Sequence, residues 1–121
     1  PALAADAKNV EGTPQARVYR ASLKAVADGD YAAYTKCMTS QAVKEIEAKT
    51  KEMGKTPKDG MEMMKAMAPT DIKLTNLKVD GKKAVMTATG MMDKEKMMGS
   101  IDLEEENGQW KVGKQSWSNT K

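Results

Sequence analysis

The spacing of apolar residues changes at Pro69, and this change constrains the fold more than any other feature of the sequence. Before Pro69, apolar residues recur with a period of about 3.6, which is typical of helices with one buried face. After Pro69, they alternate with polar residues, which is typical of strands in a sheet covered on one side. The length of 121 residues suits one domain. We therefore predict an α+β domain, with three to four N-terminal helices packed on a four-stranded antiparallel meander.

Each expected helix begins at a Ser, Thr or Asp whose side chain caps the first turn. These caps are Thr13, Asp30, Thr39 or Ser40, and Thr56. Proline follows Thr13 and Thr56 directly, and proline favours the first helical position. Gly29, Gly54 and Pro69 are expected to end helices, because glycine adopts the left-handed cap conformation and proline cannot continue the ladder.

Turn residues divide the second half of the chain into strands. Asp80-Gly81 and Asn107-Gly108 are typical of tight hairpins. Between them, we expect residues 93–96 to form a charged four-residue loop. In the first strand the apolar phase changes near Asn76, which predicts a β-bulge there.

The expected hairpins define which residues face the helices. A loop at residues 93–96 places Gly90 opposite Gly99 on an apolar inner face. The predicted inner-face pocket is lined by Gly90, Met92, Met97, Gly99, Lys114 and Ser116. Paired glycines leave room for a sheet bend or a void, and Lys114 would hold an anionic group of a small apolar ligand. The alternative is that Lys114 reaches solvent and the glycines only bend the sheet.

The outer face of the same sheet is the second candidate site. We expect an apolar strip on this face, formed by Val85, Met91, Met98 and Trp117. On a small domain such a patch marks a partner surface, and we expect a homodimer or protein contact through it. Alternatively, the strip is covered by the C-terminal residues and by the neighbourhood of Asp102 and Glu104.

The composition excludes several kinds of chemistry. The chain has no His and only one Cys, Cys37, so it lacks the Ser–His–Asp triad, the Cys–His pair and an internal disulfide. It has eleven Met and no Phe, and we expect the methionines to fill the core. The alternative is that clustered thioethers bind Cu(I). We predict no catalytic residues, no cofactor and no metal site.

The charge pattern also limits the partners. The net charge is +3, and the Lys residues are interleaved with Glu and Asp rather than clustered. Nucleic-acid binding is therefore not expected. No apolar run approaches the roughly 20 residues of a transmembrane helix.

Residues 1–12 are small and polar, and we expect them to be a flexible tether before a single domain at residues 13–121. The absence of an initiator Met fits either a tether left after removal of a signal segment or a sequence that begins within a longer one. The first explanation implies an exported or lipid-anchored protein.

Two stretches of the sequence resemble the nuclear transport factor 2-like (cystatin-like) superfamily. They are TPQARVYRASLKAVADGDYAAYTKCMTSQAVKEI, at residues 13–46, and IKLTNLKVDGKKAVMTAT with GSIDLEEENGQWKVGKQSW, between residues 72 and 117. The chain is most similar to small bacterial exported or lipoprotein members of unknown function, which implies a location in the periplasm or cell envelope. The resemblance also implies a curved meander that gives the domain the shape of a cone. It implies a conical pocket between the long helix and the sheet, and a dimer surface on the sheet.

That superfamily includes binding domains, lyases and isomerases. The resemblance implies that an enzyme of this kind uses a pocket Asp with a Tyr or His, but this chain has no His and Asp102 is expected to face outward. We predict a non-enzymatic domain that binds a small ligand or a protein partner. A lyase or isomerase and a Cu(I)-binding protein remain the alternatives.

Overall fold

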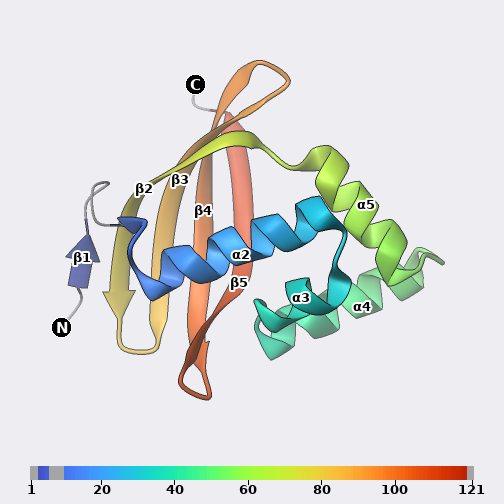
Figure 1. Cartoon of the computed structure of the whole chain (residues 1–121), viewed down its shortest axis with the longest axis horizontal. Coiled ribbons are helices and arrows are strands. Elements are labelled where there is room, and N and C mark those ends of the chain that lie inside the picture. Colours follow the sequence, from blue (N-terminus) through green and yellow to red (C-terminus); the bar gives the residue numbers. More distant parts are fainter. Residues whose placement is uncertain (1–2, 6–9, 120–121) are drawn as a thin grey trace.

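The computed structural model describes residues 3–5 and 10–119, which form one five-stranded sheet and four helices (Figure 1). The helices are α2 (Pro14–Asp28), α3 (Tyr31–Lys36), α4 (Ser40–Glu52) and α5 (Pro57–Met67). The strands are β1 (Leu3–Ala5), β2 (Thr70–Asp80), β3 (Lys83–Met92), β4 (Glu95–Glu106) and β5 (Gln109–Asn119). The strands pair antiparallel in chain order, with β2–β5 as a meander. The predicted α+β fold is confirmed.

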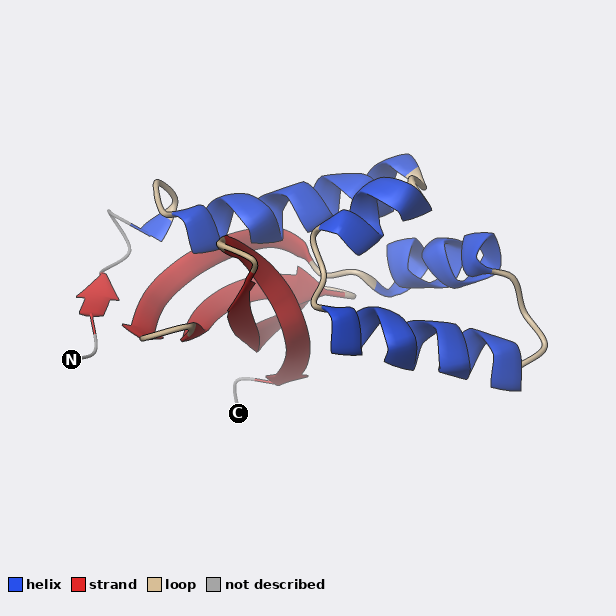
Figure 2. Cartoon of the chain, turned by 90° about the horizontal axis from the view of Figure 1, so that it is seen from below, coloured by secondary structure: helices blue, strands red, loops and turns tan. Residues whose placement is uncertain are grey.

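The helices form two groups around the sheet. Helix α2 crosses the inner face of β2–β5, whereas α3, α4 and α5 lie beyond β5 (Figures 1 and 2). Helix α5 packs on α2, α3 and α4 rather than broadly on the sheet. This arrangement leaves the end of β5 uncovered beside α5, and the candidate site lies there.

The predicted helix caps are present. The Thr13 side chain accepts the Ala16 N–H at 3.1 Å, and Thr39, rather than Ser40, accepts the Ala42 N–H at the start of α4. The remaining caps are Asp30 and a capping box between Thr56 and Asp59. Gly29 ends α2 with a φ of 69°, a conformation that costs glycine little.

Residues before α2 form part of the folded domain. Leu3–Ala5 pairs with residues 77–79 of β2 as an edge strand, and Val10 is fully buried in the core. The Glu11 carboxylate lies 2.6 Å from the Arg20 guanidinium. For these residues the expectation of a flexible tether is corrected, because backbone pairing and burial hold them on the domain.

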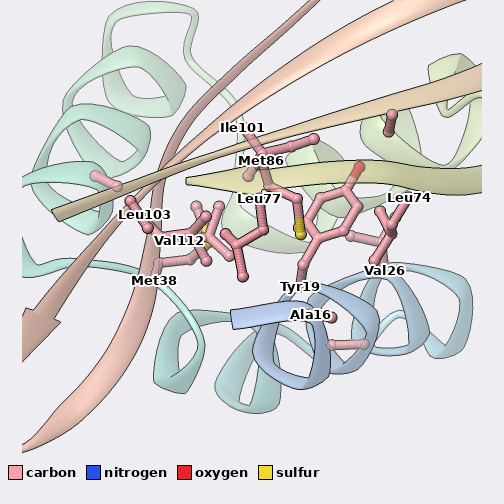
Figure 3. Close-up of a cluster of buried hydrophobic side chains, with 14 of the residues drawn as sticks. Ala16, Tyr19, Val26, Met38, Leu74, Leu77, Met86, Ile101, Leu103 and Val112 are labelled. Carbon is pink, nitrogen blue, oxygen red and sulfur yellow. The ribbon is translucent and has the colours of Figure 1, made fainter. Parts of the chain in front are cut away.

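The core lies between α2 and the inner face of the sheet. Its largest fully buried side chains are Tyr19, Met61, Met86, Ile101, Leu103, Val10 and Val112. Figure 3 shows Tyr19 directed from α2 toward the side chains of the strands. In a chain without Phe, the Tyr19 ring supplies the aromatic bulk, and flexible methionines fit around it.

The predicted bulge in the first meander strand is confirmed. The pairing of β2 with β3 shifts between Leu74 and Asn76. Because one extra residue reverses the alternation of side chains, Leu74 and Leu77 are both buried on the inner face.

The predicted register of β3 and β4 is wrong by two residues. Asp93 and Lys94 form a two-residue turn with φ values of 49° and 70°, so Gly90 lies opposite Met97 and Ala88 opposite Gly99. The longer loop was expected because four charged residues lie between two Met pairs. A lysine with positive φ is uncommon, so Asp93-Lys94 does not by itself indicate a two-residue turn. A shift of two residues keeps each side chain on its predicted face.

The predicted faces of Lys114, Ser116 and Trp117 are also wrong. The pairing of β4 with β5 shifts after Leu103–Val112, because Gly113 is an extra residue in β5. Lys114 is therefore opposite Asp102 on the exposed outer face, with Ser116 opposite Ser100. Trp117 instead lies on the inner face, against Gly99.

The Trp117 indole occupies the space above Gly90 and Gly99. A Cβ atom at Gly99 would lie 2.7 Å from the ring, and one at Gly90 would lie 3.2 Å from it. Contacts below about 3 Å are repulsive, so only glycine at position 99 permits this ring position. The Trp117 ring therefore fills the space above the two glycines, where a void was one of the two expectations from the sequence.

We predict that Gly99→Ala displaces the Trp117 ring and lowers the free energy of unfolding by about 1–3 kcal/mol. The matched control is Gly113→Ala, because a Cβ atom there would meet its nearest neighbour at an ordinary 3.4 Å. Urea unfolding followed by tryptophan fluorescence measures both effects. Equal stability losses in the two variants would contradict the close packing of the Trp117 indole on Gly99.

Candidate functional site

A half-open cleft of about 830 Å³ lies between α2, α5, the start of β2 and the ends of β3 and β5. Its apolar walls include Leu23, Val26, Met63, Met64, Met67, Pro69, Ile72, Met92 and Trp117. Its polar and charged groups include Arg20, Ser22, Tyr34, Lys49, Lys65, Asp71 and Gln115. The volume falls within the range of about 300–1,000 Å³ that is common for small-ligand sites.

Helix α5 provides most of the thioethers of the cleft. Only Met61 of α5 is buried in the core, whereas Met63 is 39% and Met67 66% exposed. Met64 and Met92 are half-buried and complete this wall. These methionines face the cleft and are available to contact a ligand.

Gln115 fixes the aromatic floor of the cleft. Its side-chain oxygen Oε1 accepts a hydrogen bond from the Tyr19 hydroxyl at 3.1 Å and another from Trp117 Nε1 at 3.0 Å. Burial raises the pKa of Tyr19 to about 12, while the nearby Arg20 charge opposes this shift. The phenol therefore remains a protonated donor at neutral pH.

The charges around the cleft differ in their availability. Arg20 is held by Glu11 and also donates from Nη2 to the Ile72 carbonyl at 2.8 Å. The hydrogen bond that the Glu11 carboxylate accepts from Arg20 is the main cause of the lowered pKa of Glu11. Lys49 and Lys65 make no salt bridge with any residue that the structure describes. The free positive charges therefore come from α4 and α5.

A second hollow of about 330 Å³ continues the cleft along β5. It lies between α3, α4 and β5, with Met38, Ala42 and Val112 among its lining residues. The residues that line both hollows are Tyr34, Lys49, Met64 and Gln115. Because these linings overlap, the two hollows are neighbours, and together they are called the groove.

The groove contains only part of the pocket predicted from the sequence. Met92 lines the cleft, and Gly90 and Gly99 lie beneath Trp117. Met97 is buried in the sheet and does not line the cleft. Lys114 and Ser116 are on the opposite face of the sheet, because the bulge at Gly113 reverses the side chains that follow it.

The sequence interpretation missed Gln115, Lys49 and the lining role of α5. The spacing of Met63, Met64 and Met67 was a detectable signal, because helical residues three and four apart share a face. Gln115 could be found only by placing the bulge at Gly113.

The predicted outer apolar strip is not continuous. Val85 is 45% and Met98 50% exposed on the outer face, but Trp117 lies on the inner one. A row of hydroxyl side chains separates Val85 from Met98, and it consists of Thr75, Thr87, Ser100 and Ser116. Met91 is half-buried on the outer face, two residues after Thr89, which pairs with Met98. An apolar strip that is interrupted between Val85 and Met98 and lacks Trp117 gives little support to a dimer surface.

The described residues contain no group of three or more His, Cys, Asp and Glu side chains that could hold a metal ion. Cys37 is buried, and burial raises the pKa of its thiol, so the nucleophilic thiolate is disfavoured. In the described lining of the 830 Å³ cleft, Asp71 is the one carboxylate, and it is exposed. Asp102 faces outward, as predicted.

None of the described helices is both long and apolar enough to cross a membrane. Comparison with protein-family models gives no match to this chain, and comparison with curated proteins gives no similar sequence. The resemblance to the nuclear transport factor 2-like superfamily stays a prediction.

We predict that Tyr19 makes the fold sensitive to alkaline pH. Because the folded-state pKa is about 12 and the ordinary value is 10.0, the unfolded chain releases this proton first as the pH rises. The stabilisation from Tyr19 is therefore complete below about pH 10 and is lost between about pH 10 and 12.

Urea unfolding at pH 8–11.5 tests this behaviour against Tyr19→Phe. The variant should lose about 0.5–1.5 kcal/mol at pH 8, because the hydrogen bond to Gln115 is absent. Its stability should then decline less steeply above pH 10 than that of the unchanged protein. Parallel declines would show that Tyr19 has no raised pKa.

Proposed function

We propose that this domain is a non-catalytic binding module for a small, mostly apolar ligand, which occupies the cleft beside α5. The observation that carries the proposal is the exposure of Met63 and Met67 toward a cleft whose floor is the Trp117 indole. Apolar side chains that line a concave site are stabilised when a ligand removes them from water.

The positions of the methionines support binding over core filling. Met61 and Met86 are almost completely buried and account for the packing role expected of methionine. Met63 and Met67 instead are exposed and line the cleft, and half-buried Met64 lines it while it also packs against the core. Because thioether side chains are flexible, this wall can adapt to ligands of different shape.

The chemistry of the cleft favours binding over catalysis. General acid–base catalysis needs titratable groups within hydrogen-bond reach of each other and of the substrate. Tyr19 donates to Gln115, and Arg20 is held by Glu11, so both are engaged in the structure of the site. Among the described lining residues, the carboxylate available to a lyase or isomerase is that of Asp71, which is exposed. The expected export or lipid anchoring stays a prediction.

We predict that the neutral dye N-phenyl-1-naphthylamine binds in the cleft and raises the melting temperature. Met64→Trp fills the centre of the groove and should weaken dye binding by about tenfold or more. Met53→Trp is the matched control, because Met53 is also exposed on the helical side but does not line the cleft. Dye fluorescence and thermal unfolding measure the two effects.

Two results would contradict the proposal. One is an absence of dye binding to the folded protein. The other is equal loss of affinity in the Met64 and Met53 variants, because that would place the dye outside the cleft.

Cu(I) binding is the second candidate function. The structure brings Met63, Met64, Met67 and Met92 from two elements to one cleft. Soft thioether ligands suit Cu(I), and no imidazole or thiolate is needed for such a site.

The triple variant M63L/M64L/M67L separates the two candidates. It preserves apolar side chains and removes three sulfur atoms. If the cleft serves apolar ligands, dye affinity should change less than about threefold. If it serves Cu(I), competition with a Cu(I) chelator should show binding in the unchanged protein and its loss in the triple variant. A retained Cu(I) affinity would exclude this cleft as the metal site.

A further inference from the structure

Polar groups gather where the two hollows of the groove adjoin, and this place is called the junction. Tyr34, Lys49 and Gln115 line both hollows there, together with the apolar side chain of Met64. The larger hollow is also lined by Trp117. A ligand in the larger hollow would therefore have both these polar residues and an apolar wall within its lining.

Gln115 offers a donor at this junction. Its oxygen already accepts from Tyr19 and Trp117, which fixes the orientation of the amide. The amide nitrogen makes no hydrogen bond to the part of the chain that the structure describes. A ligand at the junction would therefore meet an N–H donor, and it would complete the hydrogen bonding of the amide.

Lys49 offers a positive charge that makes no salt bridge with any residue that the structure describes. Glu45 lies one turn earlier on α4 and lines the smaller hollow with Lys49. Its Oε1 accepts a hydrogen bond from Gln41 Nε2 at 3.2 Å. Tyr34 is buried and adds a hydroxyl to the lining of the junction. Burial raises the pKa of Tyr34, which keeps this hydroxyl protonated at neutral pH.

We propose that the groove binds a single-chain anionic amphiphile, with its head group at Lys49, Gln115 and Tyr34 and its chain against Met64 and Trp117. This inference rests on the proposed binding function and names the class of ligand. The junction combines a positive charge with hydrogen-bond donors, which an anionic acceptor satisfies. A neutral or cationic head would leave the charge of Lys49 without a partner.

Displacement of the neutral dye by decanoate, decyl phosphate and decan-1-ol tests the inference. At least one anion should bind about fivefold or more tightly than the alcohol, which has the same chain. Decanoate and decyl phosphate distinguish a fatty-acid head from a phosphate head. Lys49→Gln should remove the preference, whereas Lys51→Gln should keep it, because Lys51 is exposed on the same helix and does not line the groove.

Gln115→Glu provides a second variant that keeps the floor of the cleft. A carboxylate can still accept from Tyr19 and Trp117, but it removes the donor and repels an anion. This variant should bind decanoate about tenfold more weakly and should bind the alcohol with little change. Circular dichroism and tryptophan fluorescence check that the fold is preserved.

The outcomes separate this inference from the proposed function. If the alcohol and both anions bind equally, the cleft binds apolar ligands but the head-group site is wrong. If none of the three ligands displaces the dye or raises the melting temperature, the proposed function itself fails. Equal effects of Lys49→Gln and Lys51→Gln would also overturn the head-group site.

Discussion

The position of the Trp117 indole over two glycines determines the shape of the candidate site. Gly90 and Gly99 have no side chains to occupy the inner face, so the ring lies against the sheet and forms the floor of the cleft. The hydrogen bond to Gln115 then fixes the ring and connects it to Tyr19 in the core. Because the same hydrogen bonds join the core and the cleft, a substitution at Tyr19 should also alter the position of the Trp117 ring in the cleft.

The methionines serve two different purposes in this chain. Met61 and Met86 replace the missing phenylalanines in the core, where flexible side chains fill irregular space. Met63 and Met67 are exposed on α5 and line the cleft, and half-buried Met64 lines the cleft while it packs against the core. The two exposed methionines of α5 are better explained by the site than by packing.

Local interactions made much of the fold predictable from the sequence. Helix caps at Thr13, Asp30 and Thr56 depend on hydrogen bonds within three residues, and each appears where it was expected. The bulge near Asn76 was also predictable, because the apolar residues on each side of it fall out of phase. Non-local pairing was harder to predict, because turn chemistry at Asp93-Lys94 changed the register.

The candidate site was less predictable than the fold because it depends on a single extra residue. The bulge at Gly113 reverses every later side chain of β5, so Lys114 leaves the inner face and Gln115 enters it. A glycine inside a strand is a known sign of a bulge, but hydrophobic alternation does not reveal it when the following residues are polar. The cleft also needs α5 to lie beside the end of β5, which no local pattern specifies.

Methyl NMR of the methionines tests the central claim most directly. With 13C-labelled methionine methyl groups, a titration with decan-1-ol should shift the signals of Met63, Met64, Met67 and Met92. The signals of Met86 in the core and Met98 on the outer face should stay in place. Shifts confined to Met98, or an absence of shifts at saturating alcohol, would contradict a binding cleft beside α5.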